Sequence, residues 1–193
     1  MPFGFDAALA LLEERGVLML ASHRTLPSLA TAVTGEHVRG SWWGHARGGE
    51  IYDLANRLED ASLVTKLVEG KVTFVAPRLH AALLRVVLDP AHRRACKLDA
   101  EAISLLAKVQ RMGELRLGEV KASKGARNAL EIALLVRSAQ VHTASGKHAT
   151  VLSRWDRWAS GALRSEAAAL SLADALVGLR VATAGTRTAF DEL

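Results

Sequence analysis

The 193-residue sequence has little cysteine and no long apolar run, and each shortage excludes a class of protein. Its single cysteine, Cys96, cannot build a disulfide framework or a four-cysteine zinc site. No stretch of 18 apolar residues occurs, so we expect no membrane-spanning helix and no membrane partner. Charged residues at 13–15 interrupt the first apolar stretch, which is not the pattern of a signal peptide. We therefore expect a soluble, reduced, cytoplasmic protein.

Motifs of metal, cofactor and hydrolase chemistry are also missing. The histidines show no close metal-ligand spacing, and no Cys-x-x-Cys occurs. The glycines of GHARGG follow a tryptophan pair rather than a hydrophobic strand, so they match a phosphate-binding loop poorly. No Gly-x-Ser-x-Gly elbow is present. The sequence predicts no metal site, no cofactor and no catalytic residue that a motif would identify.

What the sequence does have is a globular composition and an uneven distribution of charge. Half of its residues are hydrophobic and 23% are charged, and its length allows one large domain or two small ones. The net charge is +5, and residues 97–164 hold 12 Lys/Arg against 6 Asp/Glu. Residues 1–96 are almost neutral and residues 165–193 are slightly acidic. A local basic excess attracts polyanions if the fold gathers the cations together.

Hydrophobic periodicity predicts the same series of elements in both halves of the chain. In the first half we expect a helix over 5–16, a short strand over 17–22, a helix opening near Pro27, a helix from about Glu50 to Leu58, a hairpin turning at Glu69-Gly70, and a helix after Pro77. In the second half we expect helices over 98–113, 115–123 and 124–138, then a hairpin over 139–153 with its tip at 144–147. Helix, helix, helix and hairpin is the element order of a winged helix.

The predicted fold class is therefore α+β and mainly helical, with tandem winged-helix units (helix-turn-helix plus a β-hairpin wing) and a C-terminal helix. The polar, basic run DPAHRRAC suggests a boundary between the units. The expected ranges are 1–92 for the first unit, 93–158 for the second, and 159–193 for an Ala/Leu-rich helix and tail. This tail helix either packs back onto the second unit or forms a homodimer.

The second unit holds the residues that we expect to bind DNA. Cations and an asparagine gather near the start of the third helix, where a recognition helix meets the groove. Arg and Asn side chains can read guanine and adenine edges. The candidates at this helix, the wing and the segment after the wing are Lys121, Lys124, Arg127, Asn128, Lys147, His148, Arg154 and Arg157. The alternative is an ordinary solvated face, and Glu131 would repel phosphate.

A tryptophan pair marks the first unit. Trp42-Trp43 lies beside His45 and Arg47. Tryptophan is costly to expose, so burial of at least one of the two rings is the simpler interpretation. The alternative is a platform on which a base stacks, with Trp43, His45 and Arg47 as contacts to nucleic acid.

Three runs of the first half, GVLMLASHRTLPSL, SWWGHARGGEIYDL and LVTKLVEGKVTFVAPRLHAALLRV, resemble the AlkZ-related winged-helix proteins. That family includes DNA glycosylases that repair alkylated bases and interstrand crosslinks. Its glycosylases carry Gln-x-Asp or Gln-x-Gln within a run like GLLQIDS, whereas this chain has Met19 and Ala21 at the two polar positions. Neither side chain can position a water or stabilise an oxocarbenium-like sugar. The resemblance thus implies a DNA-binding scaffold without glycosylase activity.

Three functions remain open from the sequence. The leading one is a non-catalytic protein that binds double-stranded DNA, acts in regulation or in DNA repair and genome maintenance, and is associated with the nucleoid. The second is a divergent AlkZ-like glycosylase that uses other polar groups, such as His23, Glu36, His45 or Glu50. The third is a winged-helix module that binds proteins, with the C-terminal helix as its docking element.

Overall fold

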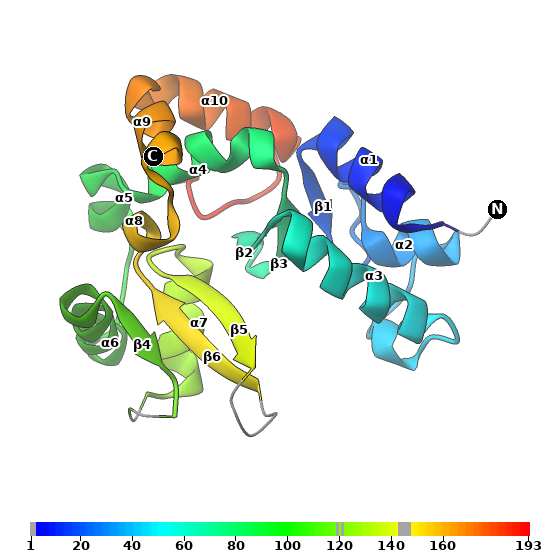
Figure 1. Cartoon of the computed structure of the whole chain (residues 1–193), viewed down its shortest axis with the longest axis horizontal. Coiled ribbons are helices and arrows are strands. Elements are labelled where there is room, and N and C mark those ends of the chain that lie inside the picture. Colours follow the sequence, from blue (N-terminus) through cyan, green and yellow to red (C-terminus); the bar gives the residue numbers. More distant parts are fainter. Residues whose placement is uncertain (1–2, 119, 121, 143–147) are drawn as a thin grey trace. The chain divides into compact units, whose positions relative to one another are not determined.

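The fold is described here from a computed structural model that covers residues 3–118, 120, 122–142 and 148–193 (Figure 1). Its contacts divide the chain into two compact units, Met1–His80 with Val177–Thr188 and Ala81–Leu176 with Ala189–Leu193. About 53% of the structure is helical, and its strands form small antiparallel sheets, so the α+β, mainly helical class is confirmed. Among the described residues, no helix is both long and apolar enough to cross a membrane.

This division differs from the expected ranges 1–92, 93–158 and 159–193. Residues 81–92 group with the second unit, and the C-terminal segment is divided between the two units.

The first unit follows the predicted order of elements. Its helices and strands are α1 (Phe5–Arg15), β1 (Val17–Met19), α2 (Leu29–Thr34), the 3₁₀ turn η1 (Trp42–Gly44), α3 (Gly48–Ala61), β2 (Leu63–Val68), β3 (Lys71–Val75) and the 3₁₀ turn η2 (Pro77–Leu79). The predicted hairpin turn is confirmed, because Glu69 and Gly70 have positive φ angles of 50° and 69°. Two successive positive φ values are the geometry of the tight turn that joins twisted strands. The strands form a sheet in the order β1-β3-β2.

The core of the first unit lies between this sheet and its helices. Leu12 of α1, Leu18 of β1, Phe74 of β3, and Ile51 and Leu58 of α3 are wholly or almost wholly buried in one cluster. Ile51 and Leu58 lie seven residues apart, so they share the inner face of α3. The apolar stripe that predicts α3 from the sequence is the stripe that the structure buries.

The second unit contains α4 (His80–Val87), α5 (Pro90–Ala95), α6 (Ala100–Met112), β4 (Glu114–Arg116), α7 (Lys124–Ile132), β5 (Arg137–His142), β6 (His148–Ser153), α8 (Trp155–Trp158) and α9 (Gly161–Ala169). The last helix, α10 (Leu172–Ala182), has residues in both units. Strands β4, β6 and β5 form the second sheet in that order. Its core joins α6, α7 and the sheet through Leu106, Leu130 and Leu152.

Three sequence-based predictions for this half are wrong. Residues 114–116 form β4 rather than part of a helix over 115–123, because they pair with Val151–Ser153 of β6. The helix expected over 124–138 ends at Ile132, because Leu134 has a φ of 51° and residues from Arg137 onward join the sheet. The long C-terminal helix is two helices, α9 and α10, and the Ser171 hydroxyl accepts a hydrogen bond from the Asp174 N–H at the start of α10.

The hairpin expected over 139–153 is present as β5 and β6, with six paired residues from Arg137↔Ser153 to His142↔His148. Its predicted tip at 144–147 lies outside the described residues. The two units therefore share an order of strands, the first strand pairing with the third and the third with the second. They also share a helix before the first strand and a helix before the hairpin, but α2 has no counterpart among the described residues of the second unit.

Candidate nucleic-acid interface

The start of α7 is fixed by side chains from two helices. Ser123 is the N-cap of α7, and its hydroxyl oxygen accepts the Ala126 N–H at 3.1 Å. Glu101, in the first turn of α6, accepts the Ser123 N–H at 3.1 Å and the Ser123 hydroxyl at 2.7 Å. These bonds use donors that a helix start would otherwise leave to water. They also place one carboxylate at the end of α7 that we expected to meet DNA.

Three of the predicted DNA-binding residues share the outer side of α7. Ala126 and Leu130 are buried against the rest of the unit, whereas Lys124 is exposed and Arg127 and Asn128 are half-buried. Residues three and four positions apart lie next to one another on a helix. The structure therefore brings Lys124, Arg127 and Asn128 together.

Glu131 affects this group less than the sequence suggested. Its side chain is only 7% exposed, and its Oε1 lies 3.7 Å from the Nε of Arg127. That Nε is buried and makes no hydrogen bond, while about a third of the Arg127 side chain stays accessible. A carboxylate held inward beside a cation repels a phosphate less than an exposed one. The same pairing partly neutralises the positive charge of Arg127.

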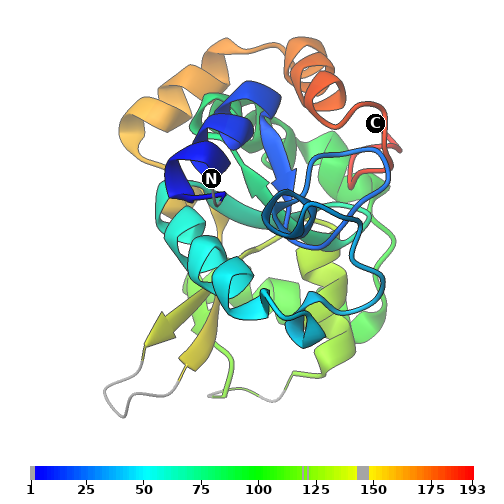
Figure 2. The ribbon, with the colours of Figure 1, turned by 90° about the vertical axis from the view of Figure 1, so that its right-hand side faces the viewer.

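The hairpin and the start of α7 lie at the same end of the second unit. In Figures 1 and 2 the first turn of α7 and the connected ends of β5 and β6 both lie at the lower end of the unit. This is where the wing residues Lys147 and His148 and the preceding Lys121 were expected to bind. Lys121 and Lys147 lie outside the described residues, and only the backbone of His148 is described, in β6.

Arg154 and Arg157 lie at the other end of β6, and the structure does not bring them to Lys124. Arg154 forms two hydrogen bonds with the Asp156 carboxylate, one of them from Nε at 2.9 Å. This pairing raises the pKa of Arg154 and lowers the pKa of Asp156. Both groups therefore stay ionised, and the carboxylate neutralises the cation that was expected to bind phosphate.

Arg157 packs against the backbone at the end of α6. A Cβ at Gly113 would lie 2.6 Å from the Nη1 of Arg157, so the guanidinium covers this glycine closely. The first unit has the same arrangement, in which Arg78 covers Gly16 and donates hydrogen bonds to the Glu13 and Glu14 carbonyls at the end of α1. Arg157 therefore has a structural position that the sequence reading did not foresee.

The tryptophan pair of the first unit is divided between core and surface. Trp42 is buried, and Trp43 is 62% exposed and stacks on Trp42 with ring centroids 4.1 Å apart. Burial of at least one ring is thus confirmed. Tyr52 of α3 lies 5.3 Å from the Trp43 ring and is also exposed, a neighbour that the sequence reading missed. Tyr52 directly follows the buried Ile51, so helical periodicity places it on the outer side of α3. That periodicity could have identified Tyr52 as an exposed aromatic residue.

His45 and Arg47 are engaged with carboxylates. The Nε2 of His45 lies 3.5 Å from Glu36, and its Nδ1 accepts the Arg47 N–H. Arg47 donates to both oxygens of Glu50, at 2.9 and 2.6 Å, and to the Val33 carbonyl. The hydrogen bonds from Arg47 lower the pKa of Glu50. Glu50 is therefore a carboxylate near neutral pH and cannot serve as a proton donor.

The position that the resemblance aligns with the polar motif of the AlkZ-related glycosylases lies in the core. Met19 is wholly buried in β1, where its sulfur accepts the Thr73 hydroxyl at 3.5 Å. His23, another polar residue named for a glycosylase, lies 3.6 Å from Glu69 at the hairpin turn. Of the four polar residues named for a glycosylase, His45 lies beside Glu36 and is bonded to the backbone of Arg47, which pairs with Glu50. His23 instead lies beside Glu69.

Neither a metal cluster nor a relative identifies the site. In the described parts of the chain, no three His, Cys, Asp or Glu side chains are placed to hold a metal ion. No protein-family model, no curated protein and no solved structure matches the chain.

Proposed function

We propose that the protein binds double-stranded DNA through its second unit, with α7 in a groove and the β5–β6 hairpin beside it as a wing. One observation carries this proposal: the outer side of α7 presents Lys124, Arg127 and Asn128 at the end of the unit where β5 and β6 are connected. The order α6, β4, α7, β5, β6 and the strand order β4-β6-β5 fit a winged helix. One part of that fold is missing, because the described residues between β4 and α7 form no helix.

Each of the three side chains has a chemistry that suits DNA. The exposed ammonium group of Lys124 in the first turn of α7 can neutralise a phosphate. Asn128, one turn further along, can donate to and accept from an adenine edge. The accessible part of the Arg127 guanidinium can contact a phosphate or a guanine. Phosphate contacts position the helix, and base contacts supply any sequence preference.

The charges of α7 predict a modest affinity. The helix carries two cations and one carboxylate, and Glu101 adds a negative charge at its start. We therefore expect few phosphate contacts and a shallow dependence of affinity on salt, with a slope that corresponds to about one or two released counterions.

The test is binding of a labelled duplex measured by fluorescence anisotropy at about 50 mM and about 200 mM salt. We expect Lys124→Glu to weaken binding at least about fivefold and to reduce the salt slope by about one. Asn128→Ala should weaken binding with little change in slope, because it removes no charge. Arg127→Gln is preferable to Arg127→Glu, because it does not place a second carboxylate beside Glu131.

The matched control is the pair Arg24→Glu and Arg39→Glu, two exposed cations of the first unit. It changes the net charge by more than Lys124→Glu does, and we expect a smaller loss of affinity. If affinity follows net charge alone, or if Lys124→Glu has no effect, α7 is not the surface that binds DNA.

The resemblance to the AlkZ-related proteins supports a role in regulation or genome maintenance without base excision. The burial of Met19 in β1 supports this, since the matching position offers no polar group to a sugar. A direct check is incubation of the protein with alkylated or crosslinked duplex, in which we expect no abasic sites. Release of a base would favour the divergent glycosylase instead.

A further inference from the structure

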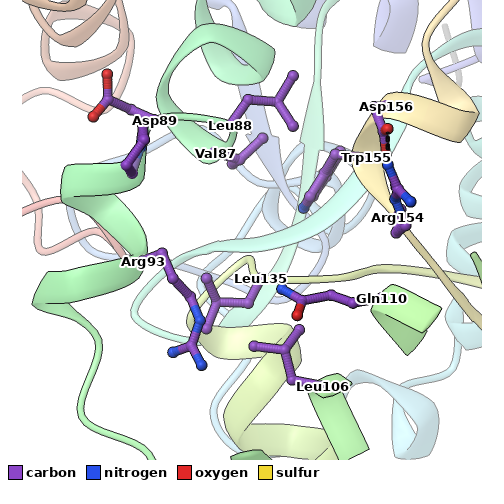
Figure 3. Close-up of a pocket in the computed structure, with 11 residues that line it drawn as sticks. Val87, Leu88, Asp89, Arg93, Leu106, Gln110, Leu135, Arg154, Trp155 and Asp156 are labelled. Atoms are coloured by element: carbon purple, nitrogen blue, oxygen red, sulfur yellow. Dashed lines mark hydrogen bonds and ion pairs between the residues drawn. The ribbon is translucent and has the colours of Figure 1, made fainter. Parts of the chain in front are cut away.

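A cavity of about 580 Å³ lies within the second unit, where α5, α6 and the segments that follow α7 and β6 meet (Figure 3). Sites for small organic molecules in proteins have volumes of about 300–1,000 Å³. The apolar part of its lining comes from Val87, Leu88, Pro90, Leu106, Leu135 and Trp155. Leu106 and Trp155 are almost wholly buried, so most of the accessible apolar surface comes from Leu88, Pro90 and Leu135. The cavity therefore offers an apolar surface of suitable size to a ligand.

Most of the charged groups in its wall already have partners. Arg154 is paired with Asp156, as described above. The Asp89 carboxylate accepts hydrogen bonds from the Arg85 Nη1 at 2.7 Å and from the Ala91 N–H at 2.8 Å. In Figure 3 this carboxylate points away from the centre of the group of side chains. These four ionised groups form two neutral pairs.

Arg93, which is half-buried, and Gln110, which is exposed, are the polar side chains of the wall without a partner among the described residues. In the part of the chain that the structure describes, neither the Arg93 guanidinium nor the Gln110 amide has a hydrogen bond or ion pair. Figure 3 shows their head groups on either side of Leu135. The cavity thus presents one uncompensated positive charge and one amide around an apolar centre. This combination suits a ligand with a single negative charge and an apolar body.

We propose that this cavity binds a small monocarboxylic acid with an apolar body. Its carboxylate accepts hydrogen bonds from the Arg93 guanidinium and the Gln110 amide, and its apolar part lies against Leu106 and Leu135. A guanidinium can donate two parallel hydrogen bonds to a carboxylate, which fixes the orientation of the acid. The binding of the acid does not depend on the DNA-binding function.

The cavity also has an internal reporter. The indole N–H of Trp155 donates to the Leu134 carbonyl at 2.7 Å, immediately after α7. His92 bonds the neighbouring Ala133 carbonyl through Nε2 at 2.8 Å. A ligand against Leu135 and Trp155 changes the surroundings of this hydrogen bond. The indole N–H resonance of Trp155 therefore reports occupancy directly.

The test uses the full chain and phenylacetate as the probe, followed by NMR. We expect a saturable shift of the Trp155 indole resonance and of the Leu106 and Leu135 methyl resonances, with half-saturation below about 1 mM. Phenylacetamide has the same shape without the charge, and phenethylamine has the opposite charge. Both should bind at least about tenfold more weakly than phenylacetate, because neither can pair with Arg93.

Arg93→Gln should weaken phenylacetate binding at least about tenfold. Arg94→Gln is the matched control, because Arg94 is exposed on the same helix and does not line the cavity. Gln110→Leu should weaken binding several-fold and removes no charge.

The proposal is overturned if phenylacetate shows no saturable shift up to about 10 mM, or if it binds no better than phenylacetamide. It is also overturned if Arg93→Gln binds as tightly as Arg94→Gln. If Arg93→Gln does not fold, the Gln110→Leu variant and the three probes on the unaltered chain decide the question. No DNA is present in this experiment, so its failure leaves the test of DNA binding untouched.

Discussion

The two units have the same scaffold and carry different surfaces on it. In each unit the helix before the first strand, α1 or α6, ends at a glycine with a φ near +80°, Gly16 or Gly113, and the strand follows at once. The carbonyl of each glycine accepts an N–H from the residue after the third strand, Ala76 at 2.9 Å and Arg154 at 3.0 Å. An arginine from the segment after the third strand then covers the glycine. The two units therefore share this local backbone arrangement, although their sequences do not match residue by residue.

The difference lies in the helix that precedes the hairpin. In α3 four carboxylates accompany one cation, whereas α7 carries two cations and one carboxylate that is held inward. The first surface should therefore repel a polyanion more strongly than the second. The first unit instead exposes Trp43 and Tyr52 next to its acidic helix. A shared fold therefore does not make the two units interchangeable in function.

The largest expected effect comes from substitutions in the two cores, which should destabilise one unit and not the other. Leu58 of α3 and Leu130 of α7 are both wholly buried. Each substitution to alanine should lower the free energy of unfolding of its own unit by about 3 kcal/mol, because it removes buried methyl groups and leaves a cavity. Amide hydrogen exchange measures this separately in the two sheets. Leu130→Ala should speed exchange most in β5 and β6, and Leu58→Ala most in β2 and β3. Equal acceleration in both sheets from either variant would show that the units open together and would contradict the prediction.

A smaller effect concerns the two glycines. Gly16→Ala and Gly113→Ala each place a Cβ on a residue with positive φ and within 2.8 Å of the covering arginine. We expect each to destabilise its unit by about 1–2 kcal/mol. In the double variant Gly113→Ala/Arg157→Ala, part of the lost stability should return. The second substitution removes the close contact with the arginine but not the strain of the positive φ angle. Thermal or urea denaturation of the single and double variants measures this coupling.

Arg157→Ala also separates two roles of that residue. If Arg157 is structural like Arg78, the single variant should lose some stability and keep its affinity for duplex DNA. If Arg157→Ala lowered the affinity for duplex DNA as much as Lys124→Glu does, Arg157 would belong to the DNA-binding surface after all.

Local patterns in the sequence predict much of the fold. The Glu69-Gly70 turn and the buried stripe of α3 depend on neighbours in the sequence, and both are present. The failures occur where distant pairing decides the structure. β4 reads as a helix from its own residues, and only its pairing with β6 makes it a strand.

The candidate site was predictable to a smaller extent. Residues on one turn of one helix, such as Lys124 and Asn128, follow from helical spacing. Whether a cation is neutralised does not follow from spacing, because it depends on the direction in which each side chain points. The pairing of Arg154 with Asp156, the inward position of Glu131 and the unpaired state of Arg93 depend on backbone directions that only the folded chain fixes. For this reason the sequence overestimated the number of cations at the interface and missed the cavity.

The smallest expected effect on stability comes from glycine substitutions in the first turns of α3 and α7. Gly49 and Gly125 are each the second residue of their helix, and a Cβ would meet nothing within 4 Å at Gly49 and only the Ser123 hydroxyl at 3.7 Å at Gly125. Both have room for alanine, and we expect Gly49→Ala and Gly125→Ala to stabilise the protein by about 0.5–1 kcal/mol, chiefly by restricting the unfolded chain.

The two variants should differ in DNA binding. If a phosphate approaches the first turn of α7, the new methyl group of Gly125→Ala lies in its path, and affinity should fall about two- to threefold although stability rises. Gly49→Ala should leave affinity unchanged, because α3 repels the duplex. Anisotropy and thermal denaturation of the same two samples test both expectations. Because the stability change has the same sign in both variants, a loss of affinity confined to Gly125→Ala cannot arise from unfolding and must come from the surface of α7. Equal affinities in the two variants would mean that the duplex does not approach the first turn of that helix.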